Sequence, residues 1–137
     1  MSQLSANVAG NKLFPPPAHG VTSVAATVFA AGTGGVRCAL KMNPTSTAGE
    51  SQVLGSIITV TPNANGDDLI LPPVAQCDGM VLYIVNLHAS DTIDLQYVDA
   101  AGSDAAMFLG AVVLDNDEIA TCVCDGTYWY AAVGTAT

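Results

Sequence analysis

The fold is decided by the stretch Gly79-Met80-Val81-Leu82-Tyr83-Ile84-Val85-Asn86-Leu87, a nearly continuous apolar run. Runs of this length and composition are typical of a β-strand that is covered on both faces. We therefore predict a core strand over residues 80–87, with Ile84 inside the hydrophobic core.

Outward from this run, the chain consists of short strand-like segments separated by turn signals. Residues 36–42 and 91–98 alternate apolar and polar side chains, which indicates half-buried strands. Asn65-Gly66 and Asp125-Gly126 mark tight turns, and Asn-Gly is the strongest short hairpin signal. Further strands are expected over residues 21–31, 53–61, 69–71, 118–124 and 127–133, and residues 105–114 fit either a strand or a short helix. Eight or nine short strands at this spacing predict an all-β fold, a single compact antiparallel β-sandwich or barrel.

The domain organisation is an arm followed by one domain. Residues 1–20 are rich in Ser, Asn, Gln and Gly and contain Phe14-Pro15-Pro16-Pro17, which favours an extended polyproline path. Two interpretations stay open for this N-terminal arm: a loose terminus, or an arm that docks on a neighbouring protomer. In the second, Phe14, Pro15, Pro16 and Pro17 are partner-interface residues. Residues 21–137 form the β domain.

Composition and charge exclude several classes of protein. The 137 residues are 50% hydrophobic and only 11% charged, and three Lys+Arg stand against twelve Asp+Glu, giving a net charge of −9. Such a chain has too few cations to follow phosphates, so we expect no nucleic-acid partner, and it is a poor ligand for an anionic membrane. No secretory signal or membrane span is predicted. Much apolar content with little charge favours burial of surface in an oligomer.

The residues with reactive side chains form no recognisable catalytic pattern. His19 lies in the arm and His88 at a strand end, and neither has a nucleophile beside it. The run Asp115-Asn116-Asp117-Glu118 has oxygen ligands but lacks a calcium-loop pattern, so a solvated turn is expected there. We predict no enzyme activity, no catalytic or metal site and no cofactor.

Four cysteines complete the inventory of candidate ligands and nucleophiles. Because no secretory signal precedes them, buried reduced thiols are favoured over disulfides, and their spacing does not suit zinc. They are Cys38, Cys77, Cys122 and Cys124.

Tyr128-Trp129-Tyr130 is the most concentrated aromatic feature. Alternation along a strand places Tyr128 and Tyr130 on one face and Trp129 on the other. One face is expected in the core, and the other is free to stack on a sugar or a partner protein. All three residues are therefore candidates for a partner interface.

Residues 55–133 also carry a series of motifs in a characteristic order. They are Gly66-Asp67-Asp68-Leu69-Ile70-Leu71-Pro72, the strand ending Ile84-Val85-Asn86, Ser90-Asp91-Thr92-Ile93-Asp94-Leu95, and Cys124-Asp125-Gly126-Thr127-Tyr128-Trp129-Tyr130. This order resembles a module of tailed-bacteriophage virion structural proteins, among them small capsid decoration (cement) proteins and fibre-like proteins.

The resemblance implies a non-enzymatic protein that is made in the host cytoplasm and binds the outer surface of the assembled capsid. Its implied partners are the major capsid protein and further copies of itself, as a homotrimer. Two alternatives stay open: a head-fibre, tail or baseplate component that contacts the host, and a carbohydrate-binding β-sandwich.

Overall fold

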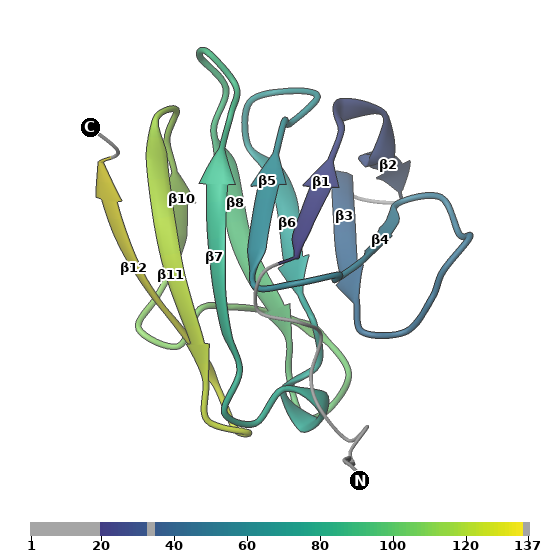
Figure 1. The fold of residues 1–137 in the computed structure, drawn as a ribbon, viewed down its shortest axis with the longest axis vertical. Helices are drawn as coiled ribbons and strands as arrows, with labels where there is room; N and C mark the ends of the chain where they lie inside the picture. Colours follow the sequence, from purple (N-terminus) through teal and green to yellow (C-terminus); the bar gives the residue numbers. More distant parts are fainter. Residues whose placement is uncertain (1–19, 33–34, 136–137) are drawn as a thin grey trace, which may run out of the picture.

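The computed structural model describes residues 20–32 and 35–135, which form two β-sheets packed face to face (Figure 1). The prediction of an all-β sandwich is confirmed. Phe14, Pro15, Pro16 and Pro17 lie outside the described residues, so their predicted interface role stays a prediction. In the described part of the chain, the helical segments are the short 3-10 turns η1 (Ala26–Val28) and η2 (Val74–Gln76), and no helix is long and apolar enough to cross a membrane.

The front sheet has five strands in the order β1-β5-β7-β11-β12. Their bounds are β1 Val21–Val24, β5 Ile57–Val60, β7 Val81–Asn86, β11 Glu118–Cys124 and β12 Trp129–Thr135. In Figure 1, β12 is the yellow strand at the left edge of this sheet.

The back sheet follows the order β10-β8-β6-β3-β2, and β4 and β9 pair with β3 and β8. Its strands are β2 Ala30–Gly32, β3 Gly35–Lys41, β4 Glu50–Gln52, β6 Asp67–Leu71, β8 Ile93–Val98, β9 Asp104–Ala106 and β10 Val112–Leu114.

The core lies between the two sheets and is built by side chains that alternate along the strands. β8 shows the expected period of two, because Ile93, Leu95 and Tyr97 are buried while the residues between them are half-buried. The front sheet contributes Ile58, Leu82, Ile84, Cys122 and Trp129, and the back sheet contributes Cys38, Leu40, Leu69, Leu71, Ile93 and Leu95.

The expected antiparallel pairing is wrong for half of the described ladders. Five of the ten strand pairs in residues 20–32 and 35–135 are parallel, including β5 with β7 and β6 with β8. The chain passes from one sheet to the other after β5, after β6 and after β7, so these consecutive strands do not pair with one another. The Asn65-Gly66 turn shows this, because Gly66 adopts φ 80° as a turn requires, yet it joins β5 of the front sheet to β6 of the back sheet. It is a turn but not a hairpin.

The strand chosen as doubly covered is covered on one face only. β7 alternates strictly: Leu82 and Ile84 are buried, whereas Val81 and Tyr83 are 38% and 42% exposed. The prediction that β7 is buried on both faces was therefore wrong, because no described strand or helix covers Val81 and Tyr83 on the outer side of the front sheet. Ile84 is in the core as predicted.

The segment 105–114, expected as one strand or helix, is divided by a turn. β9 ends at Ala106, the Gly110 N–H donates to the carbonyl of Met107 at 2.8 Å, and β10 starts at Val112.

Replacement of Ile84 tests the placement of the core. Ile84→Ala leaves a cavity at a fully buried position and is expected to lower the free energy of unfolding by about 2–5 kcal/mol. Urea denaturation followed by Trp129 fluorescence measures this loss. Val81→Ala, on the same strand but exposed, is the matched control and should change stability by about 0.5–1 kcal/mol at most. Equal effects of the two substitutions would contradict the placement of β7.

Candidate functional site

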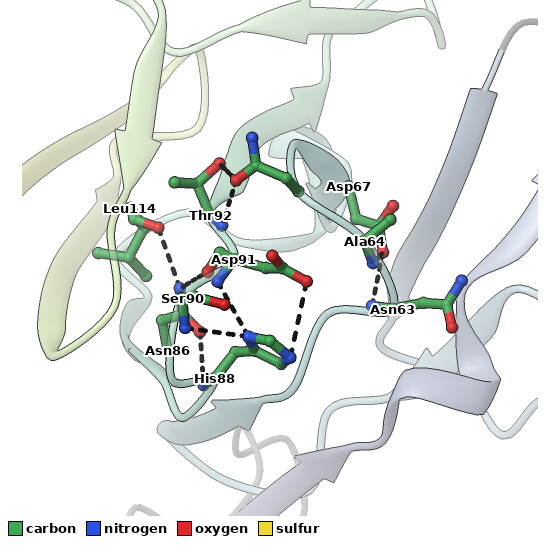
Figure 2. A network of polar contacts seen from close by, with 10 residues as sticks. Asn63, Ala64, Asp67, Asn86, His88, Ser90, Asp91, Thr92 and Leu114 are labelled. Carbon is green, nitrogen blue, oxygen red and sulfur yellow. Dashed lines mark hydrogen bonds and ion pairs between the residues drawn. The ribbon is translucent and has the colours of Figure 1, made fainter.

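The strand-end histidine is engaged in holding its own loop. His88 Nδ1 accepts hydrogen bonds from the backbone N–H groups of Ser90 at 3.2 Å and Asp91 at 2.9 Å, and its Nε2 lies 3.6 Å from the Asp91 carboxylate (Figure 2). Buried Asn86 donates to the carbonyls of Asp91 and Leu114 and accepts from the His88 N–H. These contacts link the β7–β8 loop to β10, so this polar network serves the fold.

The four cysteines are buried, and their thiols are free. Burial raises the pKa of Cys38, Cys77 and Cys122 to about 12, and it also raises the pKa of Cys124. A thiol with such a pKa is protonated at neutral pH and is a weak nucleophile. These side chains act as small core residues.

The acidic turn after β10 is closed by a hydrogen bond to one of its own carboxylates. Glu118 Oε2 accepts the backbone N–H of Asp115 at 2.7 Å, which closes the turn. Within residues 20–32 and 35–135 no group of three His, Cys, Asp or Glu is arranged to hold a metal ion. An open hollow of about 320 Å³ lies beside β3, where Lys41 Nζ and Glu50 Oε2 are 3.7 Å apart. Its lining offers polar contacts but no grouped acid, base and nucleophile.

A cluster of aromatic rings is the most developed surface feature. Phe108 contacts Tyr128 with ring centroids 4.2 Å apart and Tyr130 at 5.2 Å, and the two tyrosines are 6.3 Å apart. Phe108 and Tyr128 are 45% and 38% exposed. We call Phe108, Tyr128 and Tyr130 the aromatic cluster. Tilted and edge-on rings at these separations stabilise one another and hold a fixed apolar surface.

Trp129 does not belong to that surface. Its side chain is fully buried, and its indole Nε1 donates to the Pro72 carbonyl at 2.8 Å. The predicted alternation of the three aromatic residues is therefore confirmed, but the expectation that Trp129 contacts a partner or a sugar was wrong. Tyr128 and Tyr130 remain candidates for that role.

Asp125 fixes the turn that presents the tyrosines. Its carboxylate accepts the backbone N–H groups of Thr127 and Tyr128 and the Tyr130 hydroxyl, each at 2.8 Å. These three donors lower the pKa of Asp125. The hydrogen bond between the Tyr130 hydroxyl and the Asp125 carboxylate also raises the pKa of Tyr130. The next residue, Gly126, has φ 88°, which only glycine adopts without strain.

The aromatic cluster continues into the outer face of the front sheet. The registers align Val81 with Val123 and Tyr130 in one row, and Val21 with Ile57 and Tyr83 in the next. No residue at the outward positions of the five strands is Asp, Glu, Lys or Arg; these positions are Val21, Ser23, Ile57, Thr59, Val81, Tyr83, Val85, Ile119, Thr121, Val123, Tyr130, Ala132 and Gly134. An uncharged sheet face on an acidic chain is typical of an association surface.

Sequence reasoning missed two residues beside this surface. Phe108 belongs to the aromatic cluster, and Leu109 is 87% exposed at the tip of the turn between β9 and β10. The available signal was the apolar run Met107-Phe108-Leu109 followed by Gly110, because a glycine after apolar residues favours a turn that leaves some of them exposed.

Comparisons with known proteins give one partial similarity. No family model matches the chain, and no solved structure matches it. The Na(+)-translocating NADH-quinone reductase of Vibrio parahaemolyticus contains one subunit that is 33% identical over 78 residues, which cover 56% of this chain and 17% of that protein. The corresponding subunit from Vibrio alginolyticus is 30% identical over 81 residues, 58% of this chain and 17% of that protein. The chain thus spans about a sixth of the length of the curated relatives it matches.

The turn at Asp125 makes a prediction about pH. Its pKa lies below the ordinary 3.8 in the folded protein, so its stabilising contribution is present above that value and is lost as the pH falls through the folded pKa. At pH 7, Asp125→Asn should therefore melt below the wild type, and this difference should shrink below about pH 4. Thermal melts between pH 7 and pH 2.5 measure it.

Tyr130→Phe is the matched control for Asp125→Asn. It removes the hydroxyl donor but keeps both backbone donors, so its pH-dependent effect should be smaller and of the same sign. A difference between wild type and Asp125→Asn that stays constant down to pH 2.5 would contradict this account of the turn.

Proposed function

We propose that this chain is a non-enzymatic structural protein of a tailed-bacteriophage virion. It acts as a capsid decoration (cement) protein that binds the outer surface of the assembled shell as an oligomer, a trimer by the resemblance. The observation that carries the proposal is the uncharged outer face of the front sheet, continuous with the aromatic cluster, on an otherwise acidic domain.

The chemistry of this surface suits permanent contact with protein. Interface centres are depleted of charge and enriched in aromatic residues, and rigid aromatic side chains supply contact area at low entropic cost. On a shell with many equivalent sites, modest contacts add through avidity once a protein contacts several capsid protomers. A small domain with fixed surfaces meets this requirement without chemistry of its own.

The motifs that carry the resemblance lie at positions that determine the fold. Asp67 is buried and accepts the backbone N–H groups of Asn63 and Ala64 (Figure 2), Asn86 anchors the β7–β8 loop, and Asp125 and Trp129 fix the start of β12. Because each motif serves this architecture, the resemblance supports a shared fold, while the aromatic cluster and outer face support the role.

Two other candidates have specific support. The exposed Tyr128 and half-buried Tyr130 favour a host-contacting fibre or baseplate component that uses the same surface against a glycan, although buried Trp129 supplies no stacking platform. The partial match to the reductase favours a β module of a redox complex. A glycan panel and a titration with a soluble quinone separate these candidates from shell binding.

Shell binding tests the proposed function directly. Purified protein added to phage shells depleted of it should sediment with them and raise their melting temperature in calorimetry. Shells that neither bind the protein nor gain stability would contradict the proposal.

A charge placed beside the aromatic cluster locates the contact. Leu109→Lys changes an 87% exposed side chain, so the fold should be unaffected while shell binding weakens, because the lysine would be buried unpaired at the contact. Val113→Lys, on β10 of the back sheet and 48% exposed, is the matched control and should bind as the wild type does. Equal binding by both variants would exclude this surface as the shell contact.

A further inference from the structure

The last strand of the front sheet has an open edge. β12 pairs with β11 on one side only and is terminal in the strand order, as Figure 1 shows. At its first residue the far side is covered, because the Phe108 N–H donates to the Trp129 carbonyl at 3.1 Å. Beyond this bond, no hydrogen bond among the described residues crosses the edge from Ala131 to Thr135.

The bond from Phe108 also shows which backbone groups face that edge. In an antiparallel ladder, each residue directs its N–H and C=O to the same side, and successive residues alternate. Since the Trp129 carbonyl points away from β11, the backbone groups of Ala131, Val133 and Thr135 point away from it as well. Tyr130, Ala132 and Gly134 direct theirs to β11. The open edge therefore presents a row of donors and acceptors.

Among the described residues, the edge from Ala131 to Thr135 shows none of the features that protect natural sheet edges from pairing. Natural edge strands are protected by charged side chains, proline, bulges or a covering element. Residues 129–135 read Trp-Tyr-Ala-Ala-Val-Gly-Thr, without charge or proline, and the register with β11 is continuous from Glu118 to Cys124. Val133 is 38% exposed, so the edge is apolar as well as open.

We propose that the open edge of β12 pairs with a strand of a second copy of this chain. A second copy fits this edge because the same row of backbone N–H and C=O groups on a copy in antiparallel orientation can pair with it. Copies with a net charge of −9 repel one another, but an approach through this uncharged surface brings no like charges together. The edge adjoins the uncharged outer face through Tyr130 and Ala132, so two copies joined here extend one neutral surface. This pairing would be the contact between copies in the proposed shell-bound oligomer. The inference rests on the proposed function only in placing that contact on a phage shell.

A proline at the edge tests the pairing without disturbing the fold. Val133→Pro removes an N–H that points away from β11, which edge strands tolerate, but it blocks the addition of a strand. By light scattering at several concentrations, the wild type should show a mass of several chains and Val133→Pro the mass of one, with similar melting temperatures. Ala132→Pro is the matched control, because it removes a bond to β11 and should lower the melting temperature.

Val133→Lys keeps the test decisive if the proline variant unfolds. The lysine retains the backbone N–H and places a charge at the edge, a common natural protection, so it too should yield single chains. If the wild type shows the mass of one chain at every concentration, the inference is overturned. This is the result expected if residues 1–19 of the same chain, and not a second copy, cover the edge. A lysine variant that keeps the wild-type mass overturns the inference equally.

The shell assay separates failure of this inference from failure of the proposed function. If the edge variants keep the wild-type mass while the wild type still stabilises shells, the edge inference fails and the function stands. If the variants become single chains but the wild type does not bind shells, the function fails and the edge contact stands.

Discussion

The hydrogen bond from the buried Trp129 indole to the Pro72 carbonyl is the constraint on which the surface features depend. A buried indole N–H needs an acceptor, and Pro72, directly after β6, supplies one from the opposite sheet. This contact ties the first residue of β12 to the back sheet. Once Trp129 points inward, the two-residue period directs Tyr128 and Tyr130 outward. The packing of Trp129 in the core therefore determines that the two tyrosines of the aromatic cluster point outward.

The distribution of charge is the second organising feature. Six of the twelve acidic residues lie in turns and loops outside the strands. Several carboxylates at turns and strand ends accept nearby backbone N–H groups, as those of Asp99, Asp125 and Glu118 do. Such carboxylates define the loops, while the outer face of the front sheet carries hydroxyl and apolar side chains only. The net charge of −9 keeps copies apart wherever loops meet, and the neutral face and edge are the surfaces where approach costs least.

Much of the fold was predictable because alternation is a local signal. The bounds of β11 agree with the predicted strand over residues 118–124, and the inward positions of β8 and the split of Trp129 from its tyrosines also followed from period two. Parallel pairing was not predictable, because it depends on where the chain crosses between sheets. The Asn65-Gly66 sequence is the same whether the turn closes a hairpin within one sheet or joins strands of two sheets. β7 was misread for a related reason: Val81 and Tyr83 are apolar, so its outer face reads like a second core face.

The candidate site was only partly accessible from sequence for the same physical reason. An apolar side chain gives one local pattern whether it lies in a core or on a surface that another molecule covers, and only the packed sheets distinguish the two. Leu109 and Val133 illustrate this, since Val133 lies in a predicted strand, Leu109 lies in a segment that fits a strand or a short helix, and both are exposed in the single chain. Exposed apolar groups that serve no visible packing need a further contact to be removed from water. In a chain with so few charges, the surplus apolar surface therefore points to assembly.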